Sequence, residues 1–75
     1  MAKEIRTRHR IDIGAQLRAK REEQGWTVEQ VATMADVKPQ TVEKIENGVF
    51  NVPLDVLAQV ADVLGCDLVF RARKV

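Results

Sequence analysis

The stretch that decides the fold is residues 28–47, which read VEQVATMADVKPQTVEKIEN. Its first part places apolar side chains at helical spacing and predicts a helix over 28–35. The apolar face of that helix consists of Val28, Val31, Ala32 and Ala35. At its start, Thr27 and Gln30 form a capping box, in which the two side chains satisfy free backbone donors. The sequence therefore defines where this helix begins.

A tight turn and a second short helix complete the stretch. Asp36 is among the few non-glycine residue types that tolerate a left-handed backbone, so the segment 35–38 predicts a turn. Pro39 then opens a helix, because its ring presets the backbone angle of a first helical turn. The apolar anchors of this helix are Val42 and Ile45, and its stop is Asn47-Gly48. Two amphipathic helices joined in this way form a unit that presents its second helix to the major groove of DNA.

Two more helices are predicted, one on either side of this unit. Asp12 can cap a helix over 13–24, and Gly25 stops it. Pro53 opens a fourth helix that reaches Leu64. Together the segments predict an all-α bundle of four helices.

The two ends of the chain differ in composition from the domain expected at 13–65. Residues 1–12 are basic and poor in apolar side chains, which predicts a solvated arm that orders only on DNA or against a strand edge. Residues 66–75 alternate in polarity and contain β-branched and aromatic side chains, which predicts a short β-strand. Its expected partner is the same segment of a second subunit, and the alternative is residues 5–11.

The fourth helix also predicts a homodimer, because its apolar side chains form two stripes. The first stripe is Leu54, Leu57, Ala61 and Leu64. A small monomer core covers only one stripe, so the other needs a second subunit. The expected dimer interface combines the second stripe with the C-terminal strand and consists of Val56, Val60, Val63, Leu68 and Phe70.

Composition favours a small globular protein of the cytoplasm. The sequence is 45% hydrophobic and 31% charged, and no apolar run approaches the roughly 18 residues that a membrane span needs. Cys66 and His9 are single residues of their kind and predict neither a disulfide nor a metal site. Since no recognisable catalytic set or phosphate-binding loop is present, we expect no enzyme activity, no cofactor, no metal and no membrane partner.

The net charge of +1 is unevenly distributed. Residues 1–25 contain seven Lys or Arg and four Asp or Glu, whereas residues 26–65 contain two and six. Residues 66–75 contain three and one. The positive charge therefore lies at the two ends, and phosphate contacts are expected there and at helix N-termini.

Several stretches resemble the Cro and cI repressor-like family, also called the XRE family. They are Ile13–Arg18, Arg21–Thr27, Val31-Ala32, Gln40–Gly48 and Leu57–Gly65. Spacing agrees as well as residue type, and the likeness covers residues 13–65. It implies a lambda-repressor-like bundle that binds double-stranded DNA. Beyond Gly65 the strand-like tail is more similar to antitoxins of the HipB kind, in which a terminal strand builds the dimer.

The resemblance implies that the start of the third helix, within the reading unit 28–47, contacts bases. Gln40 and Lys44 are the expected base contacts, Thr41 contacts a base or a phosphate, and Glu43 contacts a base if it reaches the groove. The chemistry agrees, because Gln can bond adenine twice, Lys can donate to guanine and Glu can accept from cytosine. Without the resemblance, these residues fit an ordinary solvated helix face.

The resemblance also implies a structural ion pair between Arg21 and Glu46, which links the first helix to the third. Two departures bear on phosphate binding. Val28 stands where the family often has a phosphate-binding glutamine, and Pro39 removes a backbone donor. Phosphate contacts are expected instead from Thr27, Lys38, Arg18, Arg6, Arg8 and Arg10. For the three arm arginines the alternatives are a minor-groove probe and a flexible, solubilising terminus.

Two functions from different classes fit these observations. The first is a homodimeric transcriptional regulator that occupies a palindromic operator. The second is a module that binds another protein, as an antitoxin binds its toxin, and that represses its own operon. Gln40, Thr41 and Lys44 favour the first function, whereas Val28 and the acidic middle of the chain favour the second.

Overall fold

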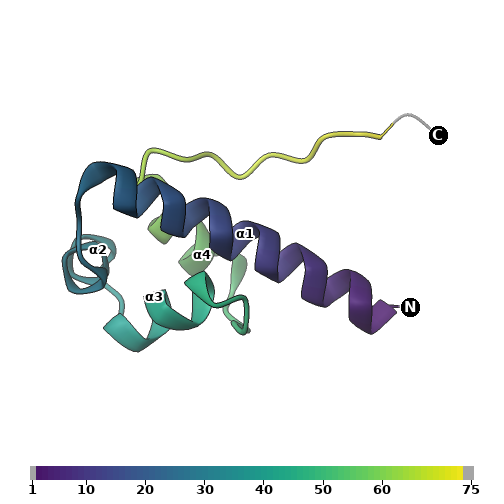
Figure 1. Ribbon diagram of the computed structural model, residues 1–75, viewed down its shortest axis with the longest axis horizontal. Coiled ribbons are helices and arrows are strands. Elements are labelled where there is room, and N and C mark those ends of the chain that lie inside the picture. Colours follow the sequence, from purple (N-terminus) through teal and green to yellow (C-terminus); the bar gives the residue numbers. More distant parts are fainter. Residues whose placement is uncertain (1, 74–75) are drawn as a thin grey trace.

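The fold consists of four helices and an extended C-terminal tail (Figure 1). A computed structural model describes residues 2–73. The helices are α1 (Ala2–Gln24), α2 (Val28–Ala35), α3 (Pro39–Glu46) and α4 (Leu54–Val63). None of these helices has the length and apolar composition that crossing a membrane requires. Residues 2–73 contain no β-strand, and the predicted all-α class is confirmed.

The boundaries of α2 and the turn after it are those that the sequence predicts. The Thr27 hydroxyl accepts a hydrogen bond from the Gln30 N–H at 3.1 Å, and the Gln30 side chain accepts one from the Thr27 N–H at 2.8 Å. Asp36 adopts a left-handed backbone with a φ of 57°. The Val37 N–H then donates to the Ala32 carbonyl at 3.0 Å. All these bonds are local in sequence, so residue type alone is enough to predict them.

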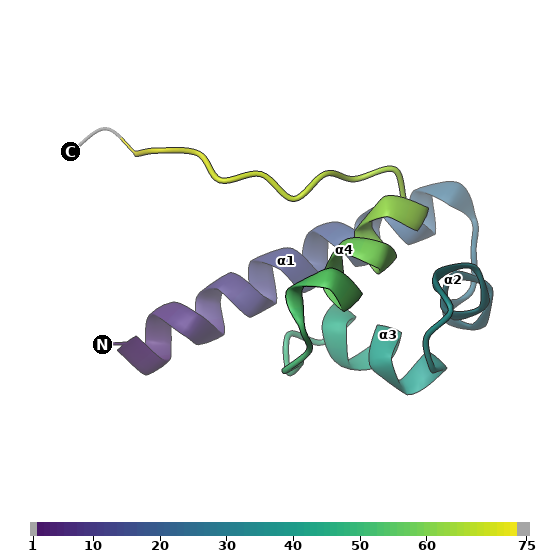
Figure 2. The ribbon, with the colours of Figure 1, turned by 180° about the vertical axis from the view of Figure 1, so that it is seen from behind.

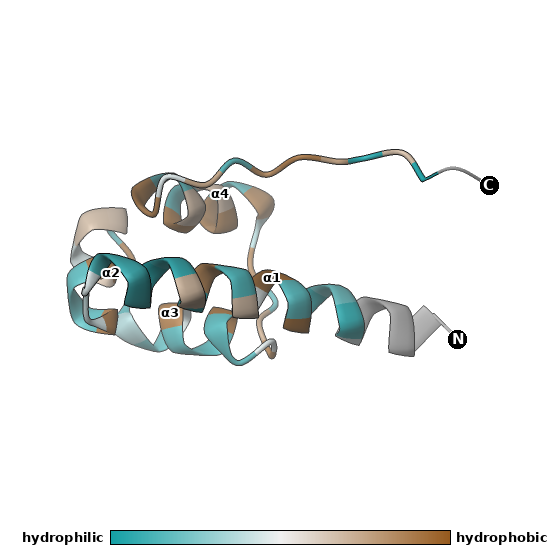
Figure 3. Cartoon of the chain, turned by 45° about the horizontal axis from the view of Figure 1, so that its top comes forward, coloured by the Kyte–Doolittle hydropathy of each residue, from teal (hydrophilic) through white to brown (hydrophobic). Residues whose placement is uncertain are grey.

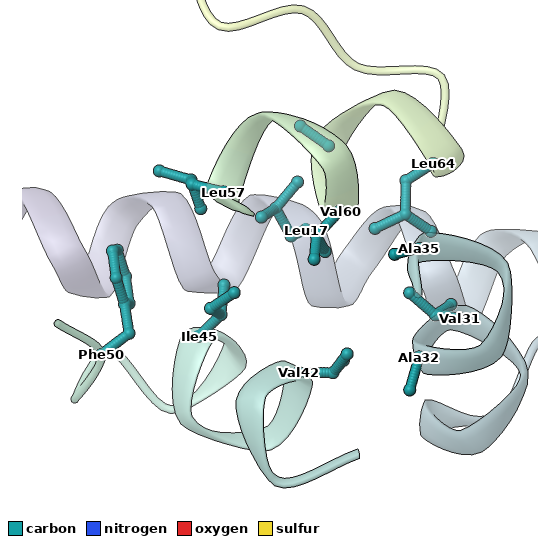
Figure 4. Packing of buried hydrophobic residues seen from close by; sticks show 11 residues of the cluster. Leu17, Val31, Ala32, Ala35, Val42, Ile45, Phe50, Leu57, Val60 and Leu64 are labelled. Atoms are coloured by element: carbon teal, nitrogen blue, oxygen red, sulfur yellow. The ribbon is translucent and has the colours of Figure 1, made fainter. Parts of the chain in front are cut away.

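The core lies where α2, α3 and α4 meet the middle of α1 (Figure 4). Its buried apolar residues are Leu17, Val31, Ala32, Ala35, Val42, Ile45, Phe50, Leu57, Val60, Ala61 and Leu64. Trp26 is partly buried against this cluster. Burying one large apolar side chain stabilises a fold by about 1.5–3 kcal/mol. The core therefore fixes which face of each short helix points inward.

The backbones of α1 and α3 approach each other closely at Gly14. This residue is buried, and a Cβ placed on it would overlap the carbonyl oxygens of Ile45 and Glu46. A residue without a side chain is needed where one backbone comes this near another. The contact sets the C-terminal end of α3 against the middle of α1.

The first helix is longer than the sequence predicts. It begins at Ala2, so an arm that orders only on DNA or against a strand edge and a helix cap at Asp12 are both wrong for the described residues. The segment is nevertheless solvated, since residues 7–9, 11 and 12 are exposed. Residues 3–12 contain neither proline nor glycine and several good helix formers. The packed half of α1 provides the nucleus of the helix, and because nothing in residues 3–12 interrupts it, the helix continues to Ala2. The projecting turns extend past the other helices, and their described residues are largely hydrophilic (Figure 3).

The C-terminal tail forms no strand within residues 2–73. After Gly65 it runs in extended form back toward the N-terminal end of α1 (Figure 2). A strand needs a neighbouring edge to pair its backbone groups. Residues 5–11 do not offer that edge, because they are helical. The predicted strand is thus not seen in the single chain, and its pairing with a second subunit stays a prediction.

Candidate nucleic-acid interface

The third helix has a buried face and an exposed face. Its apolar anchors point into the core. The residues expected to contact bases lie elsewhere on α3: Gln40, Glu43 and Lys44 are exposed, and Thr41 is half-buried. Gln40 and Lys44 are four residues apart and are therefore neighbours on the helix surface. The outer face of α3 thus carries a row of polar side chains with donors and acceptors.

The position of α3 leaves this outer face accessible. An α-helix with its side chains is about 10–12 Å wide, and the major groove of B-DNA is about 12 Å wide. The tail lies on the opposite side of α1 from α3 (Figures 1 and 2). The tail itself therefore does not cover α3.

The candidate phosphate contacts fall into two groups. Thr27 and Lys38 are exposed at the starts of α2 and α3. Since the Thr27 hydroxyl accepts the capping hydrogen bond, its own proton remains to be donated. On α1, Arg8 is exposed and Arg10 is half-buried, while the side chain of Arg6 is outside the described side chains. These arginines occur on a helix, so the flexible terminus does not describe them, and their contact with DNA stays a prediction.

Arg21 and Glu46 form the ion pair that the resemblance implies. Arg21 Nε and Nη2 donate to the two Glu46 carboxylate oxygens at 2.6 and 2.9 Å. The Glu46 side chain is 3% exposed and that of Arg21 is 14% exposed. Arg21 Nη1 also donates to the Trp26 carbonyl at 2.8 Å, a contact that the sequence does not reveal. One guanidinium therefore connects α1, the turn before α2 and the end of α3.

The two charges of this pair stabilise each other. Burial raises the pKa of Glu46, but the hydrogen bonds from Arg21 and Arg18 and the positive charges of both groups together outweigh this effect and bring its pKa below the usual value. The hydrogen bond to Glu46 in turn raises the pKa of Arg21. Glu46 is consequently ionised at neutral pH, as three N–H donors around one carboxylate require.

Arg18 also bonds to the end of α3, although the sequence predicts it as a phosphate contact. Arg18 Nε donates to Glu46 Oε1 at 3.3 Å, and Nη2 donates to Asn47 Oδ1 at 3.0 Å. The two arginines are three residues apart on α1 and share one face of it. This spacing is visible in the sequence, but the partner on α3 becomes known only from the fold.

The expected dimer interface on α4 needs a correction. Val60 is 1% exposed in the core of the single chain, so its prediction as an interface residue is wrong. The inward stripe of α4 is Leu57, Val60, Ala61 and Leu64. The inward position expected of Leu54 is wrong, because this residue is 66% exposed. Both stripes have helical spacing, and the packing of α4 on α2 decides between them. Val56 and Val63 are half-buried.

The tail borders an apolar groove of about 610 Å³ against α1 and α4. Apolar lining comes from Ile13, Leu54, Leu57, Leu68 and Phe70. Apolar residues continue along the tail (Figure 3). The side chain of Phe70 is 97% exposed and that of Leu68 is 36% exposed. The two tail residues predicted for the dimer interface are therefore accessible.

The chain matches the model of a known protein family. A family model described as helix-turn-helix matches residues 17–70, more than two thirds of the chain. The match includes α2, α3 and α4 in full. The comparisons with curated proteins and with solved structures gave no match.

Proposed function

The chain belongs to the helix-turn-helix family of DNA-binding regulators, the XRE family, and from that premise we propose that it recognises a palindromic operator as a homodimer. One observation carries the proposal. The outer face of α3 presents Gln40 and Lys44 to solvent, while its inner face is fixed by Val42 and Ile45. A helix held in this way can enter the major groove without reorganising the core.

Each side chain on the outer face has a matching base edge. Gln40 bonds adenine through N6 and N7, and Lys44 donates to O6 or N7 of guanine. Glu43 accepts from the amino group of cytosine, and the Thr41 hydroxyl bonds either a base or a phosphate. Lys38 and the arginines Arg6, Arg8 and Arg10 of α1 neutralise phosphates around the groove, and the Thr27 hydroxyl donates a hydrogen bond to one.

The homodimer is supported by the apolar surface of the tail. Exposure of Phe70 and of the apolar groove to water is unfavourable. In the proposed dimer, a second copy of the chain buries this side chain and the groove. Pairing of two tails also supplies the strand edge that a single chain lacks. In such a dimer the two α3 helices occupy half-sites about 34 Å apart, one helical turn of DNA.

The apolar groove beside the tail also favours a second function. The apolar lining from Leu54 to Phe70 and the acidic middle of the chain fit a partner protein, as in an antitoxin that binds a toxin and represses its own operon. The two functions use different surfaces and are compatible. Both place the protein in the cytoplasm, and neither requires a catalytic step.

Equilibrium DNA binding over a salt series tests the proposal. We expect the logarithm of the association constant to fall with the logarithm of salt concentration, with a slope of about −0.9 per phosphate neutralised. Gln40→Ala is expected to reduce the difference in binding free energy between a selected site and a random duplex by about 1–3 kcal/mol. Gln59→Ala is the matched control, since Gln59 is exposed on α4. No measurable binding by the wild type refutes DNA recognition and leaves the protein-binding function.

A further inference from the structure

The two ends of α3 are held in different ways. At its beginning, Lys38 makes no side-chain capping hydrogen bond. At its end, Glu46 and Asn47 are both bonded to arginines of α1. The hydrogen bonds inside this helix of eight residues do not set its orientation, which depends on its contacts with the rest of the protein. The contacts at its end therefore have a large influence on where its outer face points.

Arg18 is the residue that bonds both of these neighbours at once. Its guanidinium donates through Nε to Glu46 Oε1 and through Nη2 to Asn47 Oδ1, at 3.3 and 3.0 Å. The group is planar and rigid, so it fixes the two acceptors relative to each other. The side chain is 48% exposed, and its charge is consequently screened by solvent. Arg18 therefore contributes mainly by orienting Glu46 and Asn47, and only weakly by electrostatic attraction.

We propose that Arg18 is a positioning residue for base recognition. By holding Glu46 and Asn47 with one guanidinium, it refines the rotation of α3 that Val42 and Ile45 set in the core, and hence the direction of Lys44 and Gln40. This inference rests on the proposed function, in which those two side chains contact bases. It replaces the phosphate contact expected of Arg18, because the guanidinium is bonded to Glu46 and Asn47. A positioning residue and a phosphate contact respond differently to salt, so the two roles can be distinguished.

Binding of four single variants to a selected and a random duplex tests this role. The variants are Arg18→Ala, Arg18→Lys, Asn47→Ala and the control Lys20→Ala. Both Arg18 variants are expected to lower the ratio of the two affinities about fivefold, because lysine keeps the charge but cannot reproduce the fork. The salt slope of Arg18→Ala is expected to equal that of Lys20→Ala. A slope smaller by about 0.9, or a ratio restored by lysine, overturns the proposal in favour of a phosphate contact.

The Asn47 variant tests the route of the effect. If Arg18 acts through Asn47, then Asn47→Ala lowers the affinity ratio by a similar factor, and the double variant Arg18→Ala/Asn47→Ala loses little more. Losses that multiply in the double variant show independent roles and contradict the proposal.

Amide hydrogen exchange in the free protein gives a readout that needs no DNA. The N–H groups of Asn47 and Gly48 donate to the carbonyls of Glu43 and Ile45 at the end of α3. Arg18→Ala is expected to speed their exchange about fivefold, while the Val31 N–H in α2 stays unchanged. Unchanged exchange at the end of α3 refutes the positioning role. Failure of the wild type to bind any duplex instead refutes the proposed function, so the two failures are distinguishable.

Discussion

The middle of the molecule and its two ends satisfy their side chains in opposite ways. Between Leu17 and Leu64, the side chains of the apolar core are buried and the Glu46 carboxylate is surrounded by donors from the same chain. At the ends, α1 projects past the other helices and Phe70 is almost fully exposed. Side chains that find partners within the chain stabilise the fold, whereas exposed apolar side chains mark a surface where another molecule can bind. The contacts in the middle therefore stabilise the monomer, and the surfaces at the ends are available for assembly.

Removing the guanidinium of Arg21 is expected to have the largest effect on stability, because it disrupts the buried ion pair between α1 and α3. Arg21→Ala leaves the Glu46 carboxylate buried without its bidentate partner and is expected to lower the free energy of unfolding by roughly 3 kcal/mol. Guanidinium chloride unfolding followed by circular dichroism measures the change. Lys20→Ala, which breaks only an exposed pair with Glu23, should change stability by less than about 0.5 kcal/mol. Equal losses in the two variants would show that the α1–α3 pair has no special role.

A change at the tail is expected to leave the fold intact and weaken assembly. Phe70→Ser removes an aromatic side chain that is 97% exposed in the single chain and should leave monomer stability within about 0.5 kcal/mol of wild type. If Phe70 anchors a dimer, its association weakens by roughly 2 kcal/mol, which sedimentation equilibrium can detect. The exposed Gln59→Ala is the control. A wild type that is monomeric at all concentrations tested contradicts the dimer.

Lowering the pH is expected to have the smallest effect on stability, and this effect comes from Glu46 in the middle of the molecule. The pKa of Glu46 is lowered in the folded chain, so its ionised form stabilises the fold above the usual glutamate value, and this contribution is lost as the pH falls through the lower folded-state value. Urea unfolding of wild type and Glu46→Gln should therefore differ most at pH 7 and progressively less below about pH 4. A difference that is constant from pH 7 to pH 3 would exclude ionised Glu46 as the source.

The same contrast explains how much of the structure the sequence predicts. The limits of α2 and α3 follow from Thr27, Asp36 and Pro39, because caps and turns depend on residues next to them in the chain. The exposed positions of Gln40 and Lys44 follow from the apolar residues on the opposite face of α3. Local chemistry is therefore sufficient for the helix-turn-helix unit.

The errors concern features that distant contacts decide. Nothing near Asp12 distinguishes the start of a helix from its interior, so the helical N-terminal segment is missed. Both stripes of α4 are apolar, and only packing against α2 shows that Val60 faces inward and Leu54 outward. Arg18 has the composition of a phosphate contact, but its partners on α3 lie more than 25 residues away in sequence. These are tertiary choices that short-range patterns leave undetermined.

Nuclear magnetic resonance mapping with a duplex selected from a random pool tests the central claim most directly. Amide chemical shifts are recorded for the free and the DNA-bound protein. The outer face of α3 from Gln40 to Lys44 and the starts of α2 and α3 should shift most, with saturation at one duplex per dimer. Shifts confined to the tail and its groove, with α3 unchanged, would contradict recognition of DNA by this helix.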